Sequence, residues 1–561
     1  MTGLKNSLRY TVCSAALVGA FFAGDVSAQI SPSTIEPGRI EKRFEAPKAS
    51  PTSRVEAPAA PATAAGANRI KKSFNLKSVE VTGNTVYDTA ALESIWSGKI
   101  GTTVSQQDAA EIARSITSKY RADGYVLSQA VIRGASNGEL KLQVVEGFVN
   151  NVFIEGDEVE TNRQLISKYA EKIKAIRPLN TKDLERYLLL ADDLPGITSR
   201  GVIRPSPDTF GAADLVIQVK KKVFDASFTT DNRGTVFLGR HQHQATVAAN
   251  DLFGLYERTL LRGIVASPIQ ELRFFDIQHE QQIGNEGTKI LAYAGFTRTE
   301  PGDVLKPLDI EGESDNYRLS VSHPFLRSRK ENLSGRFTFD ARNSQTDVLT
   351  FRQSRDKIRS ARLGGSFDYA DTLDGVSLAD AELSQGLDIF GATNDGAGRT
   401  RTDGEHSYTK FNLDLSRIQN LPRGFSILTA VSGQYAFDAL LASEEFGIGG
   451  VGFGQAYDSS ELTGDHGLAG KIELRYGHDV NASFLQAFQL YTYYDVGSVW
   501  NKNTPVGVND KESLADVGFG IRMNMNQNFS GYAEVGFPLT RDVASEGDDS
   551  ARFFFSITGR F

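Results

Sequence analysis

The sequence predicts a transmembrane β-barrel of about 16 antiparallel strands, preceded by two small α+β modules and by an N-terminal helix and linker. The composition of the 561 residues, with 53 Gly, 34 Phe, 18 Tyr and only 3 Met, is typical of β-structure. From residue 222 onward, apolar and polar side chains alternate with period two, as in strands with two different faces. The sequence has no apolar run of about 18 residues, so it predicts no membrane-spanning helix.

Residues 1–28 have the pattern of a secretory signal peptide. Lys5 and Arg9 form a basic start, a short apolar run follows, and small residues up to Ala28 predict cleavage after that position. The single cysteine, Cys13, lies within this segment. The exported chain would therefore contain no cysteine and would receive no support from disulfides.

Residues 29–72 read as a short helix followed by a Pro/Ala-rich linker. Six of the 17 prolines fall between Pro32 and Pro61, which favours an extended and poorly packed chain. Within this segment, residues 33–45 have the composition of a short helix, with Pro37 acceptable only near its start. Disorder is the alternative that composition leaves open for the same residues.

Residues 73–148 and 149–221 predict two compact α+β modules with the same order of elements, in which a strand and two helices precede two strands. In the first module, Ser105 and Asp108 form a capping-box pattern ahead of apolar residues spaced four apart. In the second, a helix with the same spacing ends at the Leu-Pro-Gly sequence of 194–196. A repeat of one such unit favours a binding array over a catalytic cleft.

Residues 222–561 are long enough for about 16 strands of 9–11 residues with unequal loops. Every second residue of 425–437 is apolar, aromatic, Thr or Gly, and the residues between them are mostly small or polar. The alternate residues Lys471, Glu473 and Arg475 place charge on one face of another strand, as a hydrated lumen requires. A soluble β-sandwich is the alternative, and it is disfavoured because its inward face would be the apolar one.

Motifs for catalysis or cofactor binding are weak. Gly447, Gly449 and Gly452 fit the dinucleotide-binding spacing, but no strand–turn–helix unit surrounds them. His241 and His243 lack an acidic or cysteine partner at metal-ligand spacing, which favours a hydrated face over a metal site. The net charge of −8 gives no argument for nucleic-acid binding. The sequence therefore predicts no enzyme, cofactor or metal; an outer-membrane hydrolase is a distant alternative.

Several segments resemble one family of outer-membrane proteins. Residues 35–40 (IEPGRI) resemble its N-terminal plug helix, and residues 79–85 (VEVTGNT) resemble the first strand and turn of a POTRA domain. Residues 188–197 (LLLADDLPGI) are similar to its second POTRA domain, and 322–329 (SHPFLRSR) to a barrel segment. Over nearly the whole mature chain, the sequence resembles the two-partner secretion transporters of the hemolysin-activator and filamentous-hemagglutinin type, in the POTRA-bearing barrel superfamily. The aromatic terminus at Phe561 resembles a barrel-assembly signal.

This resemblance implies a function and a set of partners. The expected protein is a bacterial outer-membrane pore with POTRA domains at 73–148 and 149–221 in the periplasm and a barrel at 222–561. The POTRA domains would capture an unfolded exported partner, adhesin-like or cytolysin-like, which the pore would secrete and could activate. Outer-membrane lipid and the barrel-assembly machinery are further expected partners. A barrel-assembly factor of the same superfamily and a passive plugged porin or receptor are the alternatives.

The resemblance also implies a loop that folds back into the lumen. In the family, an Arg-Gly-aromatic core in this loop pairs through its arginine with an aspartate on the barrel wall. Here Gln455 stands in place of that arginine; a glutamine side chain can donate a hydrogen bond to Asp495 but cannot form a bidentate ionic contact. An ordinary glycine-rich surface turn is the alternative. The matching residues are Gln455, Ala456, Tyr457 and Asp458 in the loop and Asp495 and Gly497 on the wall.

Overall fold

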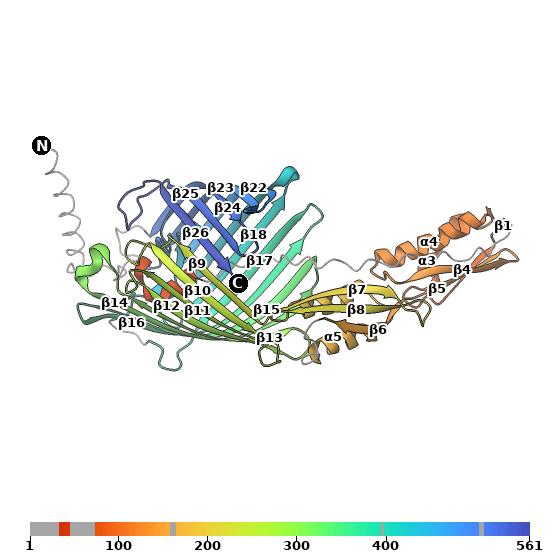
Figure 1. Ribbon diagram of the computed structural model, residues 1–561, viewed down its shortest axis with the longest axis horizontal. Helices are drawn as coiled ribbons and strands as arrows, with labels where there is room; N and C mark the ends of the chain where they lie inside the picture. The colour runs from red at the N-terminus through yellow and green to blue at the C-terminus, as the bar shows by residue number, and fades with distance from the viewer. Residues whose placement is uncertain (1–32, 45–72, 157–163, 394–397, 504–509) are drawn as a thin grey trace.

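The computed structural model of the protein describes residues 33–44, 73–156, 164–393, 398–503 and 510–561. The predicted signal peptide, 1–28, and the Pro/Ala-rich part of the predicted linker, 45–72, lie outside these residues. Of the helices that the structure describes, none has the length and apolar character needed to cross a bilayer. A barrel at one end of the molecule continues into an arm made of the two α+β modules (Figure 1).

Sixteen antiparallel strands form a closed barrel, as the sequence predicts. Each strand pairs with the next along the chain, and the last, β26, pairs with the first, β9, through residues such as Ile557 and Thr230. Closure leaves the barrel without an exposed edge. The strands are β9 (Phe224–Asp231), β10 (His241–Asn250), β11 (Glu257–Ser267), β12 (Arg273–Ile283), β13 (Thr288–Thr299), β14 (Ile310–Arg327), β15 (Glu331–Val348), β16 (Phe351–Ala370), β17 (Gly375–Gly386), β18 (Thr409–Asn420), β19 (Phe425–Ala436), β22 (His466–Ala482), β23 (Leu485–Trp500), β24 (Lys511–Asn524), β25 (Phe529–Pro538) and β26 (Arg552–Arg560).

The two faces of the barrel wall differ as the alternation predicts. Phe425 and Tyr435, on the predicted outer face of β19, are 41% and 56% exposed to the surroundings of the barrel. On the opposite face, Glu473 is buried and accepts hydrogen bonds from Arg475 and Arg522. Apolar side chains outward and charged side chains inward are the arrangement of a barrel in lipid, and this excludes the β-sandwich.

In the first module, α4 covers one face of a three-stranded sheet whose strand order is β2-β5-β4. Ser105 caps α4, and both hydrogen bonds of the predicted capping box with Asp108 are present. Leu92, Ile116 and Leu142 are among the buried residues of its core. Its elements are β1 (Phe74–Asn75), β2 (Ser78–Thr82), α3 (Thr89–Glu93), η2 (Ser97–Lys99), β3 (Thr103–Val104), α4 (Gln106–Ala122), β4 (Gln129–Ser136) and β5 (Glu139–Val145).

The second module repeats this design with the sheet order β6-β8-β7. Leu188 of α6 and Ile217 of β8 belong to its buried core. The modules are joined by Gly124, whose carbonyl accepts hydrogen bonds from the backbone and the side chain of Thr181. The elements are β6 (Phe148–Glu155), α5 (Gln164–Ala175), α6 (Thr181–Asp192), β7 (Ile197–Pro205) and β8 (Ala212–Lys221).

Ion pairs attach the second module to the near rim of the barrel. Asp193, just after α6, forms a two-point contact with Arg327 of β14, at 2.7 Å to Nε and 2.6 Å to Nη2. Lys172 and Arg186 both pair with Glu286, in the turn between β12 and β13. The segment 322–329, singled out in the sequence, therefore includes part of the barrel's docking site for this module.

The N-terminal helix lies inside the barrel. α2 (Pro37–Arg43) follows a short 3-10 turn, η1 (Ser33–Ile35), and Pro37 occupies the first helical turn, where its missing N–H is tolerated. Ile35 and Ile40 are buried in a small apolar cluster that includes Leu238. Figure 1 shows this helix in red among the barrel strands. The sequence predicted the helix, and its position in the lumen fits the implied plug.

Candidate functional site in the barrel lumen

Two segments far apart in sequence occupy the lumen together. One is α2, and the other is the loop 437–465 between β19 and β22, hereafter the lumen loop. The first barrel strand, β9, starts at the rim next to the modules, so every odd-numbered strand ends at the opposite rim. β19 is the eleventh strand, and the lumen loop therefore starts at the rim away from the modules before it turns inward. It contains η6 (Ala442–Glu444), β20 (Phe446–Ile448) and β21 (Leu462–Gly464), and Leu440, Leu441 and Ala442 are fully buried.

Direct contacts join α2 to the lumen loop. Arg39 donates hydrogen bonds to the carbonyl of Ala442 and, at 3.4 Å, to that of Glu445. Lys42 Nζ donates to the carbonyl of Ser443 at 2.7 Å. Gly38 faces Ser443 so closely that a Cβ at position 38 would lie 2.9 Å from the Ser443 Cβ. A glycine at this position therefore permits the close approach of helix and loop.

The wall of the barrel holds α2 through one carboxylate. Glu41, which is 5% exposed, accepts a hydrogen bond from Asn316 Nδ2 at 2.6 Å. The same carboxylate pairs with Arg318 at 3.3 Å and with Arg342 at 3.4 Å. Because β14 and β15 supply these partners, the helix is fixed to one side of the lumen.

Charged partners on the wall also hold the tip of the lumen loop. Glu444 pairs with Arg362 at 2.8 Å and with Lys410 at 2.7 Å. Glu445 pairs with Arg401 at 2.8 Å. Removing one partner of a buried pair is costly, whereas exchanging the whole pair for water costs little, because each charge regains hydration. The tip of the lumen loop is thus held to the wall by buried ion pairs.

Asp495 contacts the predicted loop residues through their backbone. Its Oδ2 accepts hydrogen bonds from the amide N–H of Gly454 at 2.9 Å and of Gln455 at 3.3 Å. Among the described residues, the Gln455 side chain does not form the hydrogen bond to Asp495 that the sequence analysis considered, and its buried Nε2 has no hydrogen-bond partner. Asp495 therefore holds this segment through backbone amides. Gly497 leaves room for the side chain of Ile448, because a Cβ at position 497 would lie 2.7 Å from Ile448 Cδ1.

The remaining predicted loop residues also meet the barrel wall. The amide of Ala456 donates to Asp516 Oδ2 at 2.7 Å. Tyr457, which is 2% exposed, donates its hydroxyl to the carbonyl of Ala515 at 3.2 Å. Asp458 pairs with Arg552 at 2.7 Å. The structure thus brings all six predicted site residues to one region of the wall; their functional role stays a prediction.

Two arginines, Arg552 of β26 and Arg233 between β9 and β10, hold this segment, and sequence reasoning did not assign them to it. Arg552 donates to the carbonyl of Ala456 at 2.9 Å, in addition to its pair with Asp458. Arg233 donates to the carbonyl of Gln455 at 2.7 Å. The alternation of β26 places Arg552 on the lumen face, but no local signal states which loop residue it meets.

The other motifs of the sequence do not assemble a site. Gly447 lies in β20, and Gly449 and Gly452 follow it in the lumen loop, away from any helix start. His243 of β10 is 3.0 Å from the Thr230 hydroxyl and stacks on Phe228. The described residues contain no group of three His, Cys, Asp or Glu side chains placed to hold a metal ion.

Comparison of the sequence with models of known protein families identifies the family of this chain. The family model described as haemolysin secretion/activation protein ShlB/FhaC/HecB matches residues 211–523, more than half of the chain. The chain belongs to the ShlB/FhaC/HecB family. A second model, for the ShlB-type POTRA domain, matches residues 74–147, which is the first module. This ShlB/FhaC/HecB protein is therefore an outer-membrane transporter for the secretion of a partner protein, and its POTRA region lies in the periplasm.

Relatives agree with this assignment, and a solved structure shares the fold. The heme/hemopexin transporter protein HuxB of Haemophilus influenzae (strain 86-028NP) is 24% identical over 574 residues, which cover 100% of both chains. The hemolysin transporter protein ShlB of Serratia marcescens is 25% identical over 425 residues, 73% of this chain and 72% of that one. The structure of CdiB from Escherichia coli shares the fold, with a TM-score of 0.71 at 18% identity, covering 90% of this chain and 94% of that one.

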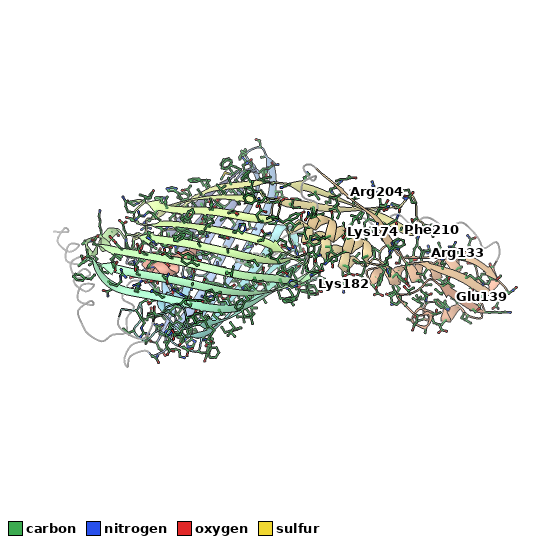
Figure 2. The ribbon with its side chains drawn as sticks, turned by 90° about the horizontal axis from the view of Figure 1, so that it is seen from below. Arg133, Glu139, Lys174, Lys182, Arg204 and Phe210 are labelled. Carbon is green, nitrogen blue, oxygen red and sulfur yellow. The ribbon has the colours of Figure 1, made fainter. Side chains whose placement is uncertain are left out.

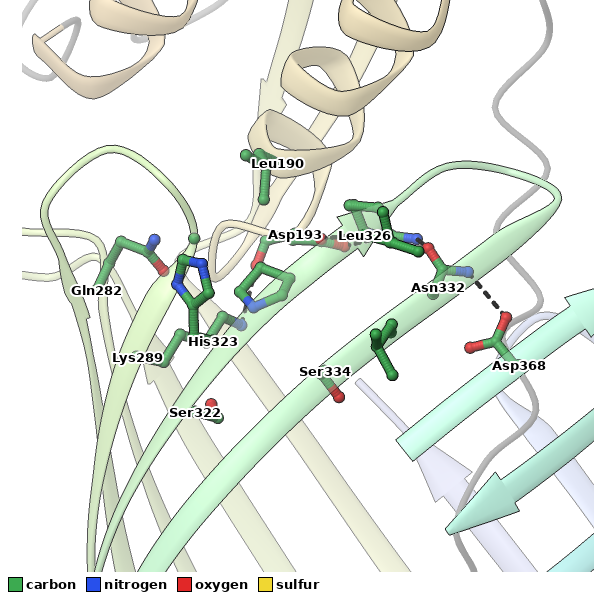
Figure 3. A pocket seen from close by; sticks show the side chains of 14 residues that line it. Leu190, Asp193, Gln282, Lys289, Ser322, His323, Leu326, Asn332, Ser334 and Asp368 are labelled. Carbon is green, nitrogen blue, oxygen red and sulfur yellow. Dashed lines mark hydrogen bonds and ion pairs between the residues drawn. The ribbon is translucent and has the colours of Figure 1, made fainter. Parts of the chain in front are cut away.

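The periplasmic mouth of this ShlB/FhaC/HecB protein contains a cavity of about 310 Å³ between the second module and the barrel. Leu190 and Asp193 come from the module, whereas Lys289, Asn332 and most other lining residues come from the barrel (Figure 3). Lys289 pairs with Glu280 at 2.9 Å, so its charge is compensated locally. The cavity is thus lined by both apolar and polar side chains and lies close to α6.

Proposed function

We propose that the two modules capture an unfolded partner as an added β-strand, and that the partner crosses the membrane through the lumen after α2 has left it. The observation that carries this proposal is the polar seating of α2, in which Arg39, Glu41 and Lys42 make its main polar contacts. Such a plug can be exchanged for water and then for a polypeptide.

Edge strands of the modules support capture by strand addition. The sheet orders place β2 and β4 at the edges of the first module and β6 and β7 at the edges of the second. The pairing of β4 and that of β6 each contain a register shift, and β2 has only five residues. Bulges and short edges resist pairing with another chain, so β7 is the best-suited edge.

β7 also has a suitable direction. Its pairing with β8 runs without a register shift from Ile197 to Pro205, over nine residues. The strand starts beside the barrel, where Gly196 lies against Asn250, and runs toward the first module (Figure 1). A client strand paired with β7 would therefore lie along the path to the periplasmic mouth. Backbone pairing provides affinity with little demand on client sequence.

We infer that the client is a large secreted protein of the adhesin or cytolysin type, delivered unfolded. The relatives' printed names mention hemolysin and heme/hemopexin, which supports an exported protein client without selecting one. The sequence has no G-x-x-x-x-G-K-S/T motif for binding ATP, so folding of the client outside the cell is the proposed bias for outward movement. Outer-membrane lipid and the barrel-assembly machinery are the other proposed partners, and the boundaries 73–148, 149–221 and 222–561 remain proposals.

Deletion of residues 73–221 tests the capture step. The expected result is loss of client secretion while the barrel still inserts, as judged by its heat-dependent mobility on a gel. Normal secretion by the deleted protein would contradict capture. Unchanged secretion in a strain lacking the whole gene would favour a passive porin, and loss of many other outer-membrane proteins would favour a barrel-assembly factor.

Photo-crosslinking tests the choice of β7. A photoreactive residue at Arg200 of β7 is expected to crosslink to a stalled client, whereas the same residue at Lys174, an exposed position on α5 of the same module, is not. Equal crosslinking from both positions would mean that the client contacts the module without strand pairing at β7.

A further inference from the structure

The periplasmic turn between β10 and β11 exposes three large apolar side chains in four residues. Leu252, Phe253 and Leu255 are 52%, 75% and 62% exposed. Single exposed apolar residues are common on proteins, but a contiguous group usually marks a contact surface for a membrane or a protein. This turn is separate from the lumen and from the rim ion pairs of Arg327 and Glu286 described above.

Buried carboxylates hold the turn rigidly in shape. Glu257, which is 2% exposed, accepts hydrogen bonds from the amides of Phe253 at 2.7 Å and Leu255 at 3.1 Å. Asp251, also 2% exposed, accepts one from the amide of Tyr256 at 2.8 Å. Asp251 and Tyr256 both have positive φ values, 49° and 56°, although neither is glycine. Strained backbone that the surroundings fix in place is typical of functional segments.

The turn continues the lipid-facing surface of the barrel. Val247 and Leu261 pair across β10 and β11 and are 50% and 43% exposed on the outer face. Gln281 of β12 shares that outer face with Ile277, and its Nε2 donates to the carbonyl of Leu255 at 2.7 Å. The turn therefore leans over the outer side of the rim, at the level where the apolar band of a barrel meets the headgroups.

The same turn is anchored in the second module. Tyr256, 5% exposed, belongs to the buried core cluster of that module. Lys221 at the end of β8 pairs with Asp251 at 2.8 Å. One part of the turn is thus fixed to the module, while Leu252, Phe253 and Leu255 stay exposed.

We propose that Leu252, Phe253 and Leu255 form a membrane foot that inserts into the periplasmic leaflet of the outer membrane and holds the second module against it. The occupant is lipid at the headgroup–acyl boundary, the depth at which apolar side chains of surface-bound segments lie. Continuity with the lipid-facing band of β10 and β11 selects lipid over a protein partner. Because Tyr256 packs in the core of the second module, the membrane foot also fixes the distance of that module from the membrane surface.

A cysteine-labelling experiment tests this inference. The predicted mature chain has no cysteine, so Phe253→Cys can carry a single environment-sensitive fluorophore in the full mature protein in liposomes. Lipids that carry a nitroxide near the headgroup quench a fluorophore that they contact, so the loss of fluorescence measures contact with lipid. Leu261→Cys on the outer wall is the positive control. Phe210→Cys, 67% exposed on the β7–β8 turn far from the barrel (Figure 2), is the negative control.

The 253 probe is expected to be quenched about as strongly as the 261 probe, while the 210 probe stays unquenched. Leu255→Cys supplies a second probe in the same turn and is expected to behave like the 253 probe. Quenching of the 253 and 255 probes at the level of the 210 probe would overturn the proposal. A blue-shifted but unquenched 253 probe would also overturn it, since the turn would then be covered by protein.

Discussion

Arg39 of α2 and Glu445 of the lumen loop form an ion pair inside the barrel, with Nη1 and Oε2 3.7 Å apart and each side chain 3% exposed. The two residues are 406 positions apart in the chain. The N-terminal helix and a loop that starts at the distant rim therefore stabilise each other. Opening of this pair is a required step if the helix is to leave the lumen.

Replacing Arg39 tests the strength of this contact. Arg39→Ala is expected to destabilise the plugged state by about 3 kcal/mol, at the lower end for a broken buried pair because Glu445 keeps Arg401. The measurement is single-channel conductance in planar bilayers, which should show more frequent and larger openings. Arg273→Ala, which removes an exposed pair with Glu300 at 2.6 Å, is the matched control and should leave conductance unchanged. Equal conductance of both variants would contradict the claim that α2, held through Arg39, blocks the pore.

The segment around Gln455 should depend on the wall carboxylate and not on the glutamine side chain. Asp495→Ala leaves two buried amides unpaired and is expected to cost about 2–3 kcal/mol. Gln455→Met keeps the volume and removes a buried amide group, so it should change stability by less than about 1 kcal/mol. Thermal unfolding in detergent compares the two. A larger loss from Gln455→Met would show that its side chain has a partner in the working protein.

The two-point contact between Asp193 and Arg327 should set the position of the second module. Arg327→Ala is expected to cost about 2 kcal/mol of docking energy, since it removes charge-assisted hydrogen bonds. Hydrogen exchange of α6 should become faster, and the double swap Asp193→Arg with Arg327→Asp should restore part of the protection. If exchange of α6 is unaltered by Arg327→Ala, the other rim contacts suffice without this pair.

Glu146 should make the first module sensitive to acid. Burial raises the pKa of Glu146, but hydrogen bonds from Thr85, Val86 and Tyr120 outweigh this effect and hold the pKa below its ordinary value. A carboxyl whose pKa is depressed by folding adds stability above its unfolded pKa, and this stability is lost as pH falls through the folded pKa. The wild-type module should therefore lose stability below about pH 4.5.

Trp96, buried in the first module, provides the readout for this titration. Urea unfolding followed by Trp96 fluorescence, in a Trp500→Phe background, should show a midpoint that falls with acid in the wild type. Glu146→Gln should be less stable at pH 7, by about 1–2 kcal/mol, and should lose most of the acid dependence. An identical pH profile for the variant would mean that another group controls acid sensitivity.

Sequence reasoning reached the fold because barrel patterning is local. Alternation over 425–437 identifies the outer face of β19 without knowledge of its neighbours, and the structure confirms this face. The pattern also places Arg552 on the lumen side. It cannot state that Arg552 meets Asp458 or that Arg39 meets Glu445, because such contacts depend on how a helix and a loop pack inside a closed wall. Pairing between residues that are 94 or 406 positions apart leaves no periodic signal.

A reversible tether between the lumen helix and the lumen loop tests the central claim most directly. A Cβ added at Gly38 would lie 2.9 Å from the Ser443 Cβ, so cysteines at both positions need only a small shift to form a disulfide. With Gly38→Cys and Ser443→Cys, client secretion should stop under oxidising conditions and return after reduction, while each single variant secretes normally. Full secretion by the oxidised double variant would show that the helix need not leave, and would contradict transport through the lumen.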